Sequence, residues 1–413
     1  MLSSIPNNSV KKIIFINRYF FPDISATSQM LTDLSVSLAK NGRRVVVLTS
    51  RLSYQNSNER LPAMGAHENV EIHRVWTSSF GRSNLAGRVL DYVSFYITSM
   101  WKLLRIVEPG DIVVAKTDPP LISVVTCLVT GFRKAFLINW IQDLFPEVAT
   151  ALGVLKIPII SFPLIWLRNL SLRAAVGNVV IGEQMRDRVL EHSVDPRAVT
   201  VIPNWADGTR VMPVDRSINA LRTEWGLQNK FVVGYSGNMG RAHDFQTIID
   251  AMRRLRHNDN VIFLFIGGGK ARYGIESELQ SQGLENYLFK PYQPRDILSE
   301  SLSVPDLHLV TLRPEMEGLI VPSKIYGICA AGRAVAFVGA PTGEIAGLIQ
   351  RFECGFTTHP GQGAELAVKI AKLQGNYRML ETLGYNARRC FEQSCDLPIA
   401  VESWETLLTR VSA

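Results

Sequence analysis

The residues best suited to chemistry lie in the stretch EMEGLIVPSKIYGICAAGRAVAFVG, which runs from Glu315 to Gly339. Carboxylates and a lysine precede a segment that predicts a helix ending near Gly332, and the apolar run from Ala334 to Val338 predicts a buried strand. Lys324 falls at the start of this helix, where the helix dipole alone disfavours a cation. An anionic ligand beside Lys324 would explain its position, and a solvated surface lysine is the alternative.

Two glycine-rich turns follow other predicted strands. The strand from Phe231 to Tyr235 runs into SGNMGR, Ser236 to Arg241, and then into a helix from about His243. Glycine lets backbone N–H groups approach a ligand closely, so this turn suits a phosphate, although a plain strand-to-helix turn would need the same residues. The second turn, from Phe265 to Gly274, is a weaker candidate of the same kind.

The elements that must position these residues follow a regular order. Short apolar runs alternate with longer amphipathic stretches, which predicts parallel sheets with crossover helices. The predicted strands are Lys12–Asn17, Arg44–Thr49, Val70–Val75, Asp111–Lys116, Ala135–Trp140, Asn178–Ile181, Phe231–Tyr235, Val261–Ile266, Asp306–Thr311 and Ala334–Val338.

A cluster of Pro, Asn, Asp and Gly from Val201 to Ser217 interrupts this order, and the pattern then restarts. We therefore expect an α/β protein of two doubly wound, Rossmann-like domains that face each other across a cleft. Residues 1–200 would form the N-terminal domain and residues 201–395 the C-terminal domain. A helix at about 396–413 would pack back on the N-terminal domain.

Composition narrows the class of protein. The chain has 413 residues, of which 46% are hydrophobic, and this is enough to form two large cores. Its net charge is +7. Residues 1–178 hold 19 Lys and Arg against 11 Asp and Glu, or +8, and residues 179–413 hold 25 against 26, or −1. No nucleic-acid-binding motif accompanies the basic half. Five scattered cysteines and the lack of a long apolar run predict a cytoplasmic protein.

Four motifs taken together resemble one enzyme family. They are VIPNW (201–205), GYSGNMGRAHDFQTIIDAM (234–252), LFIGGG (264–269) and PSKIYGICAAGRAVAFVG (322–339). Their order along nearly the whole chain resembles the retaining GT-B glycosyltransferases of family four, and within it the enzymes of colanic-acid and surface-polysaccharide synthesis. The resemblance implies a UDP- or GDP-sugar donor in the C-terminal domain, an acceptor in the N-terminal domain, and transfer without a metal or other cofactor.

The resemblance also implies site residues, with departures. The family's first acid, near the transferred sugar, matches Glu317, and Glu315 fits less well. The second acid, which holds the ribose, falls on Gly327, so ribose recognition must differ. The family's Arg and Lys pair aligns with Asn238 and His243, which leaves Arg241 and Lys324 to provide positive charge. The donor-binding residues implied are Gly237, Asn238, Gly240, Arg241, His243, Gly318, Ser323 and Lys324.

On the acceptor side, the family often has a His after the strand that corresponds to Ala135–Trp140, and this chain has Asp143 there. A carboxylate at that place could orient an acceptor hydroxyl or take its proton. Asp143 also precedes Pro146, so a purely structural turn is an equal alternative. With Glu317, it completes the pair of predicted catalytic residues.

Two segments are apolar on more than one face, Leu85 to Ile106 and Leu155 to Ala175. They carry tryptophans and cations together, a mixture that suits an anionic membrane surface. These residues are Trp101, Lys102, Arg105, Trp166, Arg168 and Arg173. Core packing explains many of the apolar residues, but peripheral contact with the inner face of the cytoplasmic membrane would fit a polyprenyl-diphosphate-linked saccharide acceptor, which the resemblance suggests.

Two other functions remain open from the residues alone. One is a different GT-B enzyme, such as an epimerase or a phosphorylase. The other is a nucleotide-sugar-binding protein without transferase activity, which the glycine at position 327 would permit. No role in nucleic-acid binding is expected.

Overall fold

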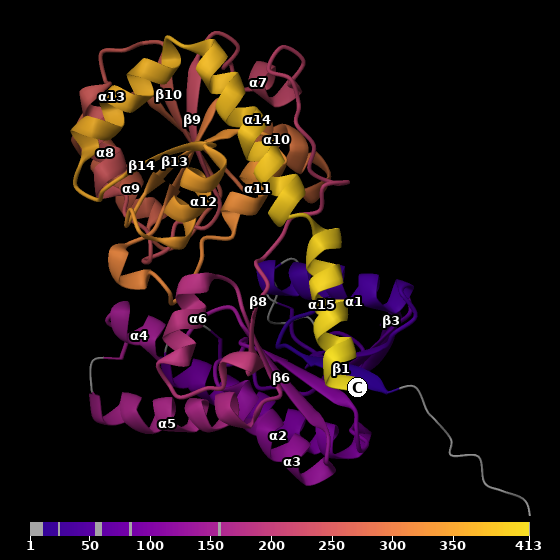
Figure 1. Cartoon of the computed structure of the whole chain (residues 1–413). Coiled ribbons are helices and arrows are strands. Elements are labelled where there is room, and N and C mark those ends of the chain that lie inside the picture. The colour runs from indigo at the N-terminus through magenta and orange to yellow at the C-terminus, as the bar shows by residue number, and fades with distance from the viewer. Residues whose placement is uncertain (1–10, 24, 54–59, 82–84, 156–157, 413) are drawn as a thin grey trace, which may run out of the picture.

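The computed structural model describes residues 11–23, 25–53, 60–81, 85–155 and 158–412. Figure 1 shows two α/β domains, one above the other, with the last helix running from the upper domain down onto the lower one. The central strands of both sheets are short, apolar and buried on both faces, as expected when helices cover each face of a parallel sheet.

The N-terminal sheet has eight strands in the order β3-β4-β2-β1-β5-β6-β7-β8. All neighbouring strands are parallel except β3 and β4. The strands are β1 (Lys12–Ile16), β2 (Arg44–Ser50), β3 (Met64–His67), β4 (Val70–Val75), β5 (Ile112–Lys116), β6 (Phe136–Ile141), β7 (Gly177–Val180) and β8 (Val199–Val201).

Helices cover both faces of this sheet. On one face, α2 and α3 bury Phe95, Leu103 and Val129 against the strands, and on the other α1 buries Leu31 and Leu34. The helices of this part of the chain are α1 (Ala26–Lys40), α2 (Leu85–Ile106), α3 (Ile122–Arg133), α4 (Glu147–Ala151), α5 (Pro158–Ala174), α6 (Glu183–Leu190) and the 3-10 turn η1 (Pro196–Ala198).

The C-terminal sheet has six parallel strands in the order β11-β10-β9-β12-β13-β14. Its strands are β9 (Phe231–Ser236), β10 (Val261–Ile266), β11 (Tyr287–Lys290), β12 (Leu307–Thr311), β13 (Ala334–Val338) and β14 (Gly355–Thr358). Its helices are α7 (Ala220–Glu224), α8 (Gln246–Arg254), α9 (Arg272–Ser281), η2 (Arg295–Ile297), α10 (Leu298–Ser303), η3 (Pro314–Met316), α11 (Lys324–Ala330), α12 (Glu344–Phe352), α13 (Gly363–Gln374) and α14 (Tyr377–Ser394).

The chain crosses between the domains twice. The first crossing follows β8, and the second joins α14 to α15 (Leu397–Ser412), which packs on the N-terminal sheet. At Ala206 the two crossings are bonded to each other, because its N–H donates to the carbonyl of Cys395 and its carbonyl accepts from the N–H of Leu397. Trp404 of α15 lies 5.0 Å from Trp140 between ring centroids.

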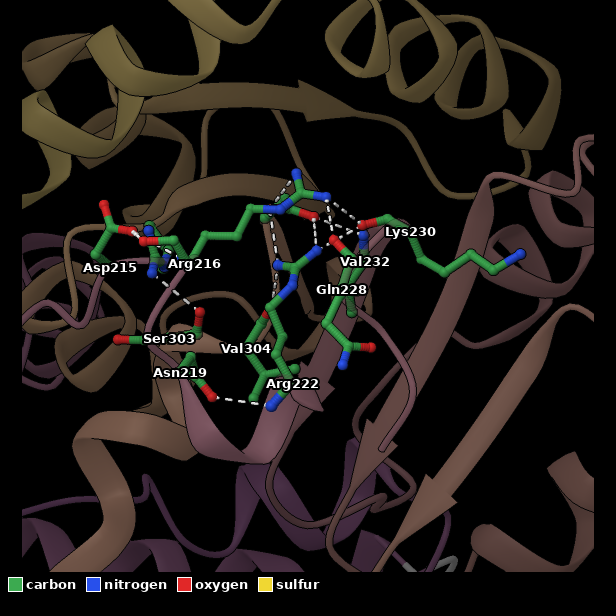
Figure 2. A network of polar contacts seen from close by, with 12 residues as sticks. Asp215, Arg216, Asn219, Arg222, Gln228, Lys230, Val232, Ser303 and Val304 are labelled. Atoms are coloured by element: carbon green, nitrogen blue, oxygen red, sulfur yellow. Dashed lines mark hydrogen bonds and ion pairs between the residues drawn. The ribbon is translucent and has the colours of Figure 1, made fainter. Parts of the chain in front are cut away.

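A buried polar network fastens the segment after the first crossing to the C-terminal sheet (Figure 2). The guanidinium of Arg222 is 1% exposed and forms two bonds with Asp306, of 2.9 and 3.0 Å. Asp306 also accepts from the backbone N–H of Val232 at 2.8 Å and pairs with Arg216 at 3.5 Å. Because Asp306 precedes β12 and Val232 lies early in β9, the network sits at the amino ends of these strands.

Ligands of doubly wound sheets bind where the strand order reverses, outside the carboxyl ends of the strands. In the N-terminal sheet the chain proceeds from β1 to one side and from β5 to the other, so its switch point lies between β1 and β5. In the C-terminal sheet the reversal lies between β9 and β12. The site should therefore be built from the loops that follow these four strands.

Candidate active site

The loop after β9 forms one wall of the C-terminal switch point. Gly237 has φ +128°, a conformation that side chains rarely adopt, and its N–H donates to the carbonyl of Ile266 at the end of β10. The hydroxyl of Tyr235 donates to the carbonyl of Asn238 at 2.8 Å. The loop is thus held from both sides, while Asn238 and Arg241 are exposed. Helix α8 begins at Gln246, three residues later than the sequence pattern indicated.

Lys324, the first residue of α11, points into this loop. Although the residue is partly exposed, its Nζ is buried and has no hydrogen-bond partner among the described residues. The Nζ lies 3.5 Å from the ring centroid of Tyr235, and a Cβ added at Gly237 would lie 3.6 Å from Lys324 Cε. Burial holds the pKa of Lys324 well below its usual value. An unpaired buried ammonium is costly, so this position favours an anionic ligand.

His243 lies beside Lys324 but adds no positive charge. Its Nδ1 is 2.5 Å from the carbonyl oxygen of Thr311, at the end of β12. Burial and the nearby Lys324 lower the pKa of His243 to about 3, so the ring is neutral at pH 7. His243 therefore joins the two strands of the switch point, and Lys324 is the buried basic side chain there.

Glu317 occupies the loop between η3 and α11. Its Oε2 accepts from the N–H of Glu344 at 3.4 Å, at the start of α12, and its Oε1 is buried with no partner in the described chain. Burial raises the pKa of Glu317 to about 7; the hydrogen bond from the N–H of Glu344 opposes this shift, and the negative charge of Glu344 adds to it. Glu315 instead forms an exposed ion pair with Arg313. Of the two acids, Glu317 is the one with a free acceptor inside the protein.

The other predicted donor residues lie around this centre in different ways. Ser323 is exposed and precedes α11 without a side-chain capping bond. Gly318, with φ +75°, packs against α6 of the other domain, where an added Cβ would lie 3.0 Å from Arg188 Cγ. A Cβ at Gly327 would lie 3.1 Å from Leu302 Cδ1, so this position faces α10. A groove of about 630 Å³ beside α8 and α9 includes only His243 from the predicted donor residues.

The N-terminal switch point holds a second buried lysine, which the sequence pattern did not single out. Lys116 ends β5 with no exposed surface, donates to the carbonyl of Thr27 at 2.9 Å, and lies 3.9 Å from the ring centroid of Trp140. Burial lowers the pKa of Lys116 to about 7, against the opposing effect of three carboxylates. These are Asp118, Asp143 and Asp33.

Asp143 follows β6 and lies next to this lysine. The protein around Asp143 and the carboxylate of Asp118 raise its pKa, whereas Lys116 lowers it. The side chain of Asp143 is exposed. Asp143 and Thr117 are among the residues that line a small cavity of about 20 Å³, which is enough for about one water molecule.

The loops that carry the two predicted catalytic residues contact each other between the domains. The N–H of Leu144, next to Asp143, donates to the carbonyl of Leu319, two residues after Glu317, at 2.9 Å. Further contacts join the two domains. The N–H of Gln184 in α6 donates to Glu344 at 3.3 Å, and Arg295 lies 3.1 Å from Asp33 of α1.

The prediction that Arg168 lies on the surface is wrong. Arg168 was expected on a basic membrane-facing surface, but it is 5% exposed and forms a two-bond pair with Glu147 at 2.7 and 3.1 Å. It therefore joins α5 to α4 in the interior. Lys102 and Arg105, by contrast, lie on the accessible side of α2.

The paired Rossmann-like domains, whose loops after the strands contact each other, define a protein of the GT-B class. The model for the glycosyl transferase 4-like domain matches residues 26–205, and the model for glycosyl transferases group 1 matches residues 217–390. The chain is 32% identical over 284 residues to a Pseudomonas aeruginosa protein named as the glycosyltransferase WbjE, covering 66% of this chain and 68% of that one. The chain belongs to the glycosyltransferases and is an enzyme of that family.

Other relatives and solved structures agree. An Escherichia coli (strain K12) protein named as the colanic acid biosynthesis glycosyl transferase WcaI is 34% identical over 182 residues, which span 43% of this chain and 44% of that one. Sucrose-phosphate synthase from Thermosynechococcus elongatus has a TM-score of 0.79 at 15% identity, covering 97% and 99% of the two chains. Anabaena Alr3699/HepE in complex with UDP and glucose has a TM-score of 0.73 at 17% identity, covering 97% and 100%. At such identities the structures establish the fold alone.

Proposed function

We propose that this enzyme transfers a sugar from a UDP- or GDP-sugar to a polyprenyl-diphosphate-linked saccharide during surface polysaccharide synthesis. The proposed binding of the nucleotide-sugar donor rests on one observation, the unpaired, buried Nζ of Lys324 at the C-terminal switch point. A relative of the same fold is solved with UDP and glucose. The names of WbjE and WcaI support the glycosyl transfer, and that of WcaI also supports the polysaccharide context.

In this proposal Lys324 takes over the role of the family's missing Arg and Lys pair. Asn238 and His243 carry no charge, and Arg241 points to solvent, but Lys324 reaches the same loop from α11. A diphosphate between Lys324 and the N–H groups of the glycine loop would meet fixed donors before the bond breaks. Such preorganised donors stabilise the charge that develops on a departing phosphate.

The acceptor would enter from the N-terminal side of the cleft. Asp143 is exposed there, and the neighbouring Leu144 contacts the loop of Glu317. We propose that Asp143 orients the attacking hydroxyl, that Glu317 binds the transferred sugar, and that the acceptor attacks from the face that the diphosphate leaves. This geometry gives retention of configuration and needs no metal. Domain closure would exclude water from the donor.

Membrane contact is part of the proposal, through one face of the N-terminal domain. Apolar side chains are strongly exposed on α2, α3 and α5, among them Trp101 (59%), Phe132 (76%) and Phe162 (73%). Cations border them at Lys102, Arg105 and Arg173. The described part of the chain has no helix long and apolar enough to cross a bilayer. A peripheral position at the inner face of the cytoplasmic membrane would bring the cleft to a lipid-linked acceptor.

The decisive experiment is a screen for the donor followed by product analysis. Thermal shift with UDP, GDP and ADP identifies the nucleotide, and mass spectrometry with sugar donors of that nucleotide identifies the transferred sugar. We expect UDP or GDP to raise Tm and one donor to release its nucleoside diphosphate. If no nucleoside diphosphate stabilises the protein, the donor assignment is wrong.

A further inference from the structure

Two helices beside the candidate site begin at a glycine and have no cap of their own. Gly343 precedes α12 and Gly182 precedes α6, and neither offers a side chain to accept from the first N–H groups of its helix. Neither glycine has a φ in the left-handed region, so backbone conformation does not require glycine at these places. A glutamate from elsewhere in the chain instead lies against each helix start.

Glu317 is the acid at the start of α12. Its Oε2 accepts from the N–H of Glu344 at 3.4 Å, and a Cβ added at Gly343 would lie 2.3 Å from its Oε1. No other residue fits at Gly343 without moving the carboxylate of Glu317. The small residue therefore keeps room for the acid that is proposed to bind the sugar.

Glu344 is the acid at the start of α6, across the boundary between the domains. Figure 1 shows α6 on the side of the lower domain that faces the upper one. The Oε2 of Glu344 accepts from the N–H of Gln184 at 3.3 Å, and a Cβ added at Gly182 would lie 2.6 Å from the Glu344 carboxyl carbon. A carboxylate suits the positive end of a helix. Glu344 thus caps α6 through its side chain and donates to Glu317 through its backbone.

The loop of Glu317 has a second attachment to the N-terminal domain. Leu319 is buried in an apolar cluster with residues of that domain, Met185 of α6 among them. The carbonyl of Leu319 accepts from the N–H of Leu144 at 2.9 Å. Glu317 therefore lies between two contacts that join the domains, one made by Leu319 and the other by Glu344.

We propose that Glu344 is a positioning residue that couples the contact between the domains to the placement of Glu317. This inference rests on the proposed role of Glu317 in binding the transferred sugar. While the domains touch, the cap on α6 fixes the start of α12, and the N–H of Glu344 fixes the carboxylate of Glu317. When the domains part, Glu344 loses α6 and Leu319 loses its cluster, so Glu317 loses its support on both sides. The sugar site is then complete only when the two domains are together, which limits loss of the donor to water.

Amide hydrogen exchange of the free, full-length protein tests the coupling, with mass spectrometry as the readout. Glu344→Ala removes the cap from one domain, and Gly182→Ala displaces the same carboxylate from the other. Both should speed the exchange of peptides that contain Leu144 by about three- to tenfold, as expected for loss of one partly exposed hydrogen bond to a charged group. Gly347→Ala is the matched control, because it adds a Cβ to α12 in open space and should change nothing.

Exchange that rises only in α6, with the Leu144 peptides as slow as in wild type, overturns the inference. An equal rise in Gly347→Ala overturns it too, since the effect would not depend on the cap. If Glu344→Ala does not fold, Gly182→Ala decides alone.

Release of UDP from UDP-glucose gives the second readout. Glu344→Ala and Gly182→Ala should lower kcat by about tenfold or more, because a misplaced carboxylate costs rate. The affinity for UDP should stay, since the nucleotide is proposed to bind at Lys324. Glu344→Gln keeps an oxygen that accepts from α6 and should recover most of the rate. Full activity in Glu344→Ala, or equal losses of kcat and UDP affinity, contradicts a positioning role. Absence of UDP release by wild type would count against the proposed function, whereas hydrogen exchange tests the coupling independently.

Discussion

Replacing Lys324 by Met should weaken donor binding and stabilise the free protein at the same time. In the free protein the Nζ is buried without an acceptor, so a methionine of similar length removes a desolvation cost. With a diphosphate bound, the same Nζ would make a charge-assisted hydrogen bond. The two effects have opposite signs, which separates a ligand-binding lysine from one that only supports the fold.

The magnitudes follow from these contacts. A hydrogen bond to a charged group contributes about 1.5–3 kcal/mol, so the Kd for UDP should rise about 10- to 150-fold. If removing the unpaired charge stabilises the free protein by about 1 kcal/mol, Tm should rise by about 2–4 °C. Calorimetric titration with UDP and thermal unfolding without it measure the two quantities. Lys372→Met, at an exposed lysine of α13, is the control and should change neither.

The pH dependence of stability gives a further check on the predicted stabilisation by Lys324→Met. The folded-state pKa of Lys324 lies well below its unfolded value, so the unfolded chain binds more protons and stability rises with pH until the unfolded lysine titrates, near about 10.4. The advantage of Lys324→Met should therefore shrink as the pH rises toward that value. A variant that binds UDP as tightly as wild type, or that melts at a lower temperature without ligand, would refute this account of Lys324.

Three other changes test separate parts of the structure. Glu317→Gln should reduce the rate of UDP release far more than the affinity for UDP, because the carboxylate is proposed to contact the transferred sugar; equal losses in both measurements would remove it from that role. Asp306→Asn should destabilise the fold by about 3 kcal/mol or more, since it leaves the buried Arg222 without its carboxylate, and an unchanged Tm would contradict this. Joint replacement of Lys102, Arg105 and Arg173 by Gln should release the protein from anionic vesicles while UDP affinity is kept; co-sedimentation that is equal for wild type on neutral and anionic vesicles would exclude this surface.

Central strands were predictable because they are buried on both faces and read as continuous apolar runs. All ten predicted strands are present, within a residue or two of their expected bounds. The strands that were missed are short: β3, β8, β11 and β14. Each is an edge strand of its sheet and pairs with one neighbour. Little in its residue pattern therefore distinguishes it from a loop.

Residues of the candidate site could be proposed from the sequence where a motif marked them, and not where the fold alone brings residues together. Lys324 and Glu317 stand in one recognisable stretch. Lys116 ends a predicted strand, but its contact with Thr27 joins residues 89 positions apart. The signal that could have found it is its place at the carboxyl end of a strand next to the reversal of strand order. Arg168 was misplaced because an amphipathic pattern does not show the ion pair with Glu147.

The bonds at Ala206 give the enzyme a single pivot. Both passages of the chain between the domains meet there, each bonded to the other. Trp205 stacks on Trp140 of the N-terminal sheet, and Trp404 packs edge to face on the same ring. Two connections that meet at one point permit rotation but resist sliding. Movement of one domain against the other would then be a swing about this point. The contacts of Glu344 with Gln184 and of Arg295 with Asp33 would part together, and a small angle at the pivot would become a wide opening at the rim of the cleft.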